Sequence, residues 1–201
     1  MLIEHDGADP SVADDVYVAP TAVVSGDVRL GKGCRVLFGA VITADGGPVE
    51  LGEDCIVMEN ALVRGRSGNA SRLGNHVLVG PHSHINGAVV EDDVFLATGV
   101  SVFPGARIEA RAEVRINGVV HVNSRVEADT TVPIGWIAVG DPAMLFPPDA
   151  HDEVWEMQRE LDFPTTLFGV GRSEHGSTRM PEITRRYSVL FGSHTEDRVI
   201  E

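Results

Sequence analysis

Aliphatic residues recur every six positions over most of the chain from Val18 to Val132. Small or β-branched residues follow most of them by four positions, as Ala22 follows Val18 and Cys34 follows Leu30. A period of six fits neither a 3.6-residue helix nor the two-residue alternation of a strand. It is typical of a parallel β-helix, in which three hexads form one coil and the aliphatic side chains stack inside. The pattern therefore predicts an all-β solenoid, a left-handed parallel β-helix of hexapeptide repeats.

The six-residue step fails at three places, all between residues 42 and 90. The irregular steps begin at Ile42, Val63 and Ile85 and measure nine, ten and five residues. The first two must make residues 45–48 and 64–72 project from the coil. Because insertions in a solenoid leave its core intact and cluster where function lies, we expect the functional site beside these steps.

The pattern ends near residue 145, which divides the chain into two expected domains. Residues 1–145 are expected to form the β-helix. Residues 146–201 are expected to form a helical extension that packs on this prism or on a neighbouring subunit. Such a cover hides edge strands that would otherwise promote aggregation.

Two helices are expected in the extension. Asp149 or Asp152 is placed to cap the first helix, and Met180 to Phe191 suggests a second short one. A link that contains proline and glycine, from Phe163 to Gly176, is expected between them.

Composition and charge exclude several classes of protein. The 201 residues are 43% hydrophobic, which suffices for one compact core. No stretch approaches the ~20 apolar residues of a membrane span, and residues 1–6 do not resemble a signal peptide, so we expect no membrane and a cytoplasmic location. A formal charge of −14 argues against nucleic acid as a partner. Cys34 and Cys55 lie one coil apart and are expected to pack in the core as free thiols.

Three segments resemble a known family. Residues 18–28 (VAPTAVVSGDV) and 35–42 (RVLFGAVI) resemble the start of γ-class carbonic anhydrases, and residues 137–143 (IAVGDPA) are similar to the segment that closes the prism in that family and in hexapeptide acyltransferases. The likeness covers roughly residues 15–145. It implies a left-handed β-helix assembled as a homotrimer, with active sites between subunits.

The family's metal ligands are replaced in this chain. Three histidines there hold zinc, two from one subunit and one from its neighbour, and such a site lowers the pKa of bound water to about 7. The resemblance places these positions at Arg64, Pro81 and Asn86. The segment Thr43-Ala44-Asp45 keeps only the aspartate of the family's Arg-Gly-Asp, and Met58 replaces a glutamine. Ordinary carbonic anhydrase chemistry is therefore not expected.

Other polar residues gather around the same positions. Because adjacent coils lie ~5 Å apart, Arg64 is expected to stack between Thr43 and Asn86. His82 is expected to lie over Asn60, with His84 two residues further along the same strand. The candidate site consists of Asp45, Glu59, Asn60, Arg64, His82, His84 and Asn86.

The first hypothesis is an enzyme, a lyase or hydrolase that reuses the family's cleft. His82 or His84 acts as general acid–base, oriented by Glu59 or Asp45, and Arg64 binds a carboxylate or phosphate. The substrate-binding residues of this hypothesis are Asp45, Asn60, Arg64 and Asn86. A divalent metal such as zinc could bind through His82, His84 and a carboxylate.

Two other hypotheses use the same fold. An acyltransferase would use His82, His84 or His121 as base towards an acyl-thioester, although the long loop that grips pantetheine is not evident. A structural or binding trimer would use the polar residues as interface hydrogen bonds. His121 is interpreted as a surface or trimer-contact residue. The remaining histidines are interpreted as incidental: His5, His76, His151, His175 and His194.

Overall fold

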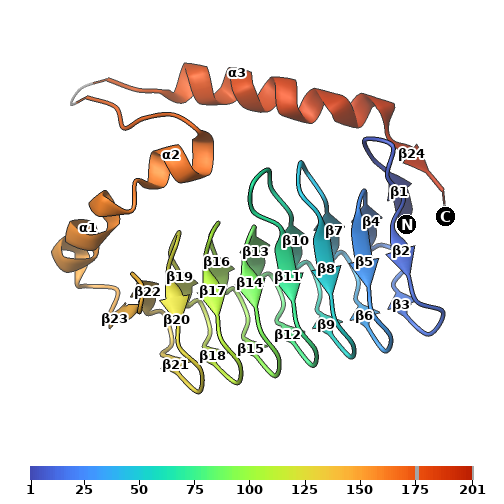
Figure 1. The fold of residues 1–201 in the computed structure, drawn as a ribbon, viewed down its shortest axis with the longest axis horizontal. Coiled ribbons are helices and arrows are strands. Elements are labelled where there is room, and N and C mark those ends of the chain that lie inside the picture. The colour runs from blue at the N-terminus through green and yellow to red at the C-terminus, as the bar shows by residue number, and fades with distance from the viewer. Residues whose placement is uncertain (175–176, 201) are drawn as a thin grey trace.

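In a computed structural model, which describes residues 1–174 and 177–200, the chain forms a parallel β-solenoid with helices at its C-terminal end (Figure 1). Strands of successive coils pair in register, so the six-residue period produces three sheets that form the sides of a prism. The predicted left-handed β-helix is confirmed. Residues 175, 176 and 201, which include His175 and the ends of the predicted link and extension, lie outside the described residues.

The three sheets contain every strand of the described chain. The first has the order β23 (Met144–Phe146), β22 (Ile137–Val139), β19 (Val119–Val120), β16 (Ser101–Val102), β13 (His84–Asn86), β10 (Leu62–Arg64), β7 (Val41–Thr43), β4 (Val23–Ser25), β1 (Leu2–Glu4) and β24 (Arg198–Val199). The second has β2 (Ser11–Val12), β5 (Val28–Leu30), β8 (Val49–Leu51), β11 (Ser71–Leu73), β14 (Val89–Val90), β17 (Arg107–Ile108) and β20 (Arg125–Val126). The third has β21 (Thr131–Val132), β18 (Glu113–Val114), β15 (Phe95–Leu96), β12 (Leu78–Val79), β9 (Ile56–Val57), β6 (Arg35–Val36) and β3 (Tyr17–Val18).

The aliphatic residues of the repeat form the core. Ile42, Val63 and Ile85 occupy matching positions in adjacent coils, and their side chains are fully buried. Cys34 and Cys55 are buried free thiols, as expected, and donate hydrogen bonds to the carbonyls of Gly52 and Gly74 at 3.1 and 3.0 Å. A continuous stack of this kind removes apolar surface from water in every coil, which stabilises the prism along its length.

Two corners flank the strands of the first sheet. The regular corner precedes each of the parallel strands from β7 to β22, and each coil there turns through one residue of positive φ, as at Gly39, Asn60, His82 and Gly99. The irregular corner follows each strand, and the three irregular steps occur there in successive coils, after β7, β10 and β13. The loop after β10 closes on itself through a bridge between Arg66 and Asn69. All three length changes therefore alter one corner of the prism.

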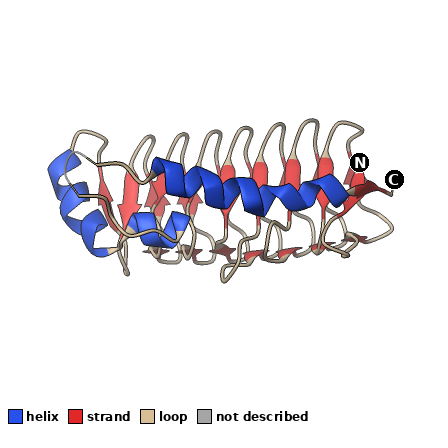
Figure 2. Cartoon of the chain, turned by 90° about the horizontal axis from the view of Figure 1, so that it is seen from above, coloured by secondary structure: helices blue, strands red, loops and turns tan. Residues whose placement is uncertain are grey.

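The C-terminal extension covers two parts of this prism. Helix α1 (His151–Glu160) packs against β22 at the end of the solenoid, where Val154 is buried. Helix α2 (Phe163–Phe168) precedes α3 (Met180–Leu190), and α3 runs back along the outside towards the N-terminus (Figures 1 and 2). A 3₁₀ turn over Phe191–Glu196 leads to β24, which pairs antiparallel with β1. The extension therefore returns the C-terminus to the first coil.

Two details of the predicted extension are wrong. The residue at the N-cap of α1 is Ala150 rather than Asp149 or Asp152, and no side chain caps that helix. The predicted link contains helix α2, because Pro164 fits the first turn of a helix, where its missing N–H is not needed. Within the described residues, no helix combines the length and apolar character needed to cross a bilayer.

Candidate functional site

A cavity of about 400 Å³ lies where the irregular corner meets α2 and α3. The loops after β7 and β10 project towards these helices and form one wall (Figure 1). Helical residues form the other wall, so the cavity depends on the extension as much as on the repeat. The lining residues are Asp45, Arg64, Arg66, Ser67, Thr165, Thr166, Leu167, Phe168, Gly169, Arg186, Tyr187, Leu190 and Phe191.

Asp45 is the buried centre of the polar contacts in this cavity. Its carboxylate accepts a hydrogen bond from Thr43 Oγ1 at 2.9 Å, and His194 Nε2 lies 3.3 Å from the same oxygen. Arg64 Nε lies 2.9 Å from the other oxygen. That contact is an ion pair without a directional hydrogen bond, because Arg64 Nε finds no acceptor in suitable geometry. The guanidinium also lies over the ring of Phe191, 5.6 Å from its centroid.

Two further arginines contribute positive charge. Arg66 donates to the carbonyl of Leu167 at 2.6 Å, which attaches the inserted loop to α2. Arg186 on α3 donates to the carbonyl of Gly169 at 2.7 Å and pairs with Glu182 at 3.0 Å. Three guanidinium groups thus line the cavity, whereas Asp45 supplies its one carboxylate.

His84 and Asn86 lie in the next coil, in register with Leu62 and Arg64. Nε2 of His84 and Oδ1 of Asn86 are buried and have no hydrogen-bond partner. Burial lowers the pKa of His84, and the positive charges of Arg64 and Arg66 lower it further. The imidazole is therefore held in its neutral form, which accepts a proton. Buried polar atoms without partners are uncommon in proteins, and these two mark this face as a candidate for contact with a ligand.

The structure does not bring the whole predicted set together. Asp45 and Arg64 are in contact, and His84 and Asn86 lie one coil away, as the stacking prediction required. Glu59, Asn60 and His82, in contrast, lie at the regular corner, before the strands rather than after them. A strand of the first sheet separates them from the cavity of the same chain.

The prediction that His82 and His84 share one strand is wrong. His82 lies in a corner turn with φ +59° and is exposed, whereas β13 begins at His84. The positive φ turns the chain at His82, so the two side chains do not project from one extended segment. Among the described residues, one group of three histidine, cysteine or acidic side chains is placed to bind a metal, and it contains neither His82 nor His84.

Three histidines interpreted as incidental or exposed are buried or paired. His5 is 3% exposed, and its ring stacks on that of His194 with a centroid distance of 4.4 Å. His121 is covered by Phe163 of the extension, with a centroid distance of 5.4 Å, and burial lowers its pKa. The contacts of all three histidines join segments far apart in sequence, so the repeat pattern contained no signal for them.

Aromatic rings connect these histidines along the underside of the extension. Each ring lies within 6.3 Å of the next, measured between centroids. The series runs from the first sheet through the helices to the first coil: His121, Phe103, Phe163, Phe168, Tyr187, Phe191, His194 and His5. It holds the helices on the prism and closes the apolar side of the cavity.

Comparison with known proteins places this fold and site in context. No family model matches the chain. The chain is 29% identical over 195 residues to mitochondrial gamma carbonic anhydrase 2 of Arabidopsis thaliana, which covers 94% of this chain and 68% of that protein. It is 28% identical over 151 residues to gamma carbonic anhydrase 1 of the same plant, covering 72% and 53%.

The chain is similar to the γ-class carbonic anhydrases over most of its length. Its solenoid also resembles that of a UDP-N-acetylglucosamine acyltransferase from Bacteroides fragilis, with a TM-score of 0.59 at 17% identity over 93% of this chain and 82% of that one. At this identity the likeness concerns the fold alone. The family's activity therefore has to be judged from the residues of this chain.

The residues at the family's metal positions do not fit zinc. Arg64 and Asn86 lie side by side on β10 and β13, and Pro81 lies in the corner turn beside His82. Arg64 offers a guanidinium, Asn86 an amide and Pro81 no side-chain donor, whereas zinc binds neutral imidazole, thiolate or carboxylate. A fixed positive charge at Arg64 also repels a metal cation at close range. The three positions to which the resemblance assigns zinc ligands therefore offer no zinc-binding set in this chain.

Proposed function

We propose that this protein binds a small anionic molecule, such as a carboxylate, in the cavity between the irregular corner and the helices. The observation that supports this proposal is the charge of the cavity lining. Arg64 pairs with Asp45 and Arg186 pairs with Glu182, so among the described residues the lining keeps one positive charge without an ion-pair partner, that of Arg66. A guanidinium donates two parallel hydrogen bonds to a carboxylate or phosphate, so arginine is suited to this role.

The contrast with the rest of the protein strengthens the proposal. The whole chain has a formal charge of −14, so a cavity with excess positive charge is a local departure from the average. Among the described residues, Arg66 has no carboxylate within ion-pair distance, and its contacts are the carbonyl of Leu167 and the hydroxyl of Tyr187. A bound anion would complete the charge balance there.

His84 is the candidate acid–base residue of the proposed lyase or hydrolase. Its Nε2 is buried without a partner, and its lowered pKa keeps it neutral. A neutral imidazole can accept a proton. His84 lies one coil from Leu62 and Arg64 and outside the lining of the cavity, so a substrate bound at Arg64 must extend along the first sheet to reach it. Glu59, Asn60 and His82 can join this site only from another copy of the chain, which is consistent with the homotrimer that the family resemblance implies.

The test is a set of calorimetric titrations with acetate, bicarbonate and phosphate against the wild type and Arg64→Gln. We expect binding that weakens about tenfold or more in the variant, because a charge-assisted hydrogen bond contributes about 1.5–3 kcal/mol. The matched control is Arg72→Gln, since Arg72 also pairs with a carboxylate, Glu50 at 3.4 Å, but lines a groove on the second sheet. Equal affinities in the wild type and Arg64→Gln would refute the proposed role of Arg64.

Two other outcomes would favour the competing hypotheses. Protection against unfolding by an acyl-thioester such as acetyl-coenzyme A would favour an acyltransferase. The burial of His121 beneath Phe163 does not favour it, because a base must reach its substrate. A protein that binds none of these molecules, yet sediments at three times the 21.5 kDa subunit mass, would favour a structural trimer.

A further inference from the structure

Three potential metal ligands meet at Asp45, beside the cavity that this residue lines. They are the imidazoles of His5 and His194 and the carboxylate of Asp45, and their donor atoms all lie within 4.8 Å of one another. They come from the first coil, the loop after β7 and the 3₁₀ turn after α3. His5 and Asp45 are buried, and the side chain of His194 is 36% exposed.

Asp197 orients both imidazoles in the way that metal sites require. Its two carboxylate oxygens lie 2.6 Å from Nδ1 of His5 and 2.8 Å from Nδ1 of His194. Hydrogen bonds at both Nδ1 atoms leave the Nε2 atoms as the coordinating nitrogens. A carboxylate on the far nitrogen of each ligand is the usual outer contact of a metal-binding histidine, because it fixes the tautomer and orients the ring.

The surrounding charges favour a cation at this point. Asp45 and Asp197 each contribute a negative charge, and Asp6 adds a third, since its carboxylate lies 3.4 Å from His5 Nε2. Arg64 opposes a cation, but it contacts Oδ2 of Asp45, whereas His194 lies beside the other oxygen, Oδ1. Nε2 of His194 lies 3.3 Å from Oδ1 of Asp45, and a metal ion would bind between these two atoms.

We propose that His5, Asp45 and His194 bind a divalent transition-metal ion of the zinc type. Two imidazoles and a carboxylate are a ligand set that zinc, cobalt and iron accept. With bond lengths of about 2.0–2.2 Å, tetrahedral ligands lie about 3.3 Å apart. The donor atoms of the free protein must therefore draw together by up to about 1.5 Å, and the stacked rings must turn slightly. The site is separate from the family's ligand positions, Arg64, Pro81 and Asn86.

Such an ion would connect the two ends of the chain. His194 and Asp197 precede β24, and β24 pairs with β1, the strand that ends directly before His5. Binding would then hold the extension against the first coil and raise the unfolding temperature, because a ligand that binds only the folded state stabilises it.

The experiment measures metal content and spectra on the full-length protein. Protein stripped with a chelator is reloaded with Zn²⁺ or Co²⁺, gel-filtered and analysed for metal per subunit, and the visible spectrum of the Co²⁺ form reports the ligands. We expect about one ion per subunit, a raised unfolding temperature, and loss of both in His194→Ala. The partly exposed His194 is chosen over the buried His5 so that folding is preserved.

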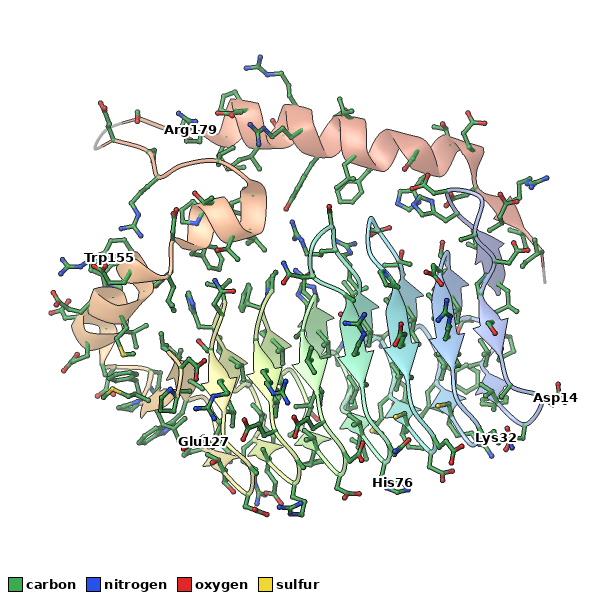
Figure 3. All side chains as sticks on the ribbon, in the orientation of Figure 1. Asp14, Lys32, His76, Glu127, Trp155 and Arg179 are labelled. Carbon is green, nitrogen blue, oxygen red and sulfur yellow. The ribbon has the colours of Figure 1, made fainter. Side chains whose placement is uncertain are left out.

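Two control variants match this change. His76→Ala removes a histidine that also lies between two carboxylates, 2.9 Å from Asp93 and 4.0 Å from Asp54, but on the prism edge far from α3 (Figure 3). His84→Ala removes a histidine beside the family's ligand positions. Both should retain the metal. Wild-type protein without metal, or undiminished metal in His194→Ala, would overturn the proposal.

A measurement on the wild type covers the case in which His194→Ala does not fold. Bound Co²⁺ should shift or broaden the imidazole resonances of His5 and His194 and leave that of His76 sharp, and the reverse pattern would overturn the proposal. Anion binding is tested separately, because Arg186→Gln should weaken the anion and leave the metal bound. The two proposals can therefore fail independently.

Discussion

The two corners of the first sheet are made by the same repeat and have different consequences. At the regular corner, the coils from β7 to β22 each turn through one residue of positive φ and hydrogen-bond to a neighbouring coil, as His82 N does to the carbonyl of Glu59 at 3.0 Å. At the irregular corner, coils of unequal length leave Asp45, Arg64 and Arg66 facing the extension. This solenoid therefore has its cavity where the repeat is interrupted and the helices cover the interruption.

The largest effect is expected from removing the centre of the irregular corner. Asp45→Ala leaves Arg64, Thr43 and His194 without their shared acceptor. Asp45 is buried, and its removal breaks both the ion pair with Arg64 and the hydrogen bond from Thr43, which is costly. Because Arg64 and His194 are partly exposed, we expect a decrease in unfolding free energy of about 2 kcal/mol, measured by urea denaturation.

The matched change at an exposed site is Asp129→Ala. Asp129 pairs with Arg111 on the prism surface, at 2.7 and 2.9 Å. Exposed ion pairs contribute little to stability, so this variant should unfold like the wild type. Equal losses in both variants would mean that the contacts of Asp45 are no stronger than those on the surface.

A smaller effect should appear as the pH falls. Burial lowers the pKa values of His84 and His121 below 6.5, and Arg64 and Arg66 lower that of His84 further. The unfolded chain therefore binds more protons than the folded one between the lowered values and 6.5, so stability is full above 6.5 and declines as the pH falls below it.

The variant His84→Gln should reduce this loss of stability, measured by urea denaturation between pH 7.5 and 5. Arg64→Gln should raise the pKa of His84 in a histidine NMR titration, because it removes a nearby positive charge. An unchanged titration in Arg64→Gln would show that burial alone sets the value.

The smallest effect is expected at the regular corner. His82→Gly replaces a residue with φ +59° by one that adopts this conformation without a steric cost. The substitution removes roughly 1 kcal/mol of left-handed backbone strain, and the backbone entropy that glycine loses on folding offsets part of this gain. We therefore expect the unfolding free energy to rise by about 0.5 kcal/mol. If the unfolding free energy instead falls by more than about 1 kcal/mol, the His82 side chain makes stabilising contacts, as it would in a subunit interface.

The hexapeptide pattern predicted the solenoid and the location of the irregular steps, because side-chain burial in a β-helix follows local spacing. The in-register stacking of Thr43, Arg64 and Asn86 was predicted from the count of three hexads per coil. The strand geometry at His82 did not, because a corner residue with positive φ interrupts the extended chain. The spacing identified which coils differ, but not the conformation of each turn.

The prism, its core and the corner at which the coils change length can all be predicted from the sequence, since each depends on residues close together in the chain. The return of the helices along that corner, the burial of His121 by Phe163 and the contacts of His194 with Asp45 and His5 depend instead on tertiary packing. These contacts join segments more than a hundred residues apart, or different elements of the fold. Their geometry depends on packing between elements, which no periodic pattern along the chain records.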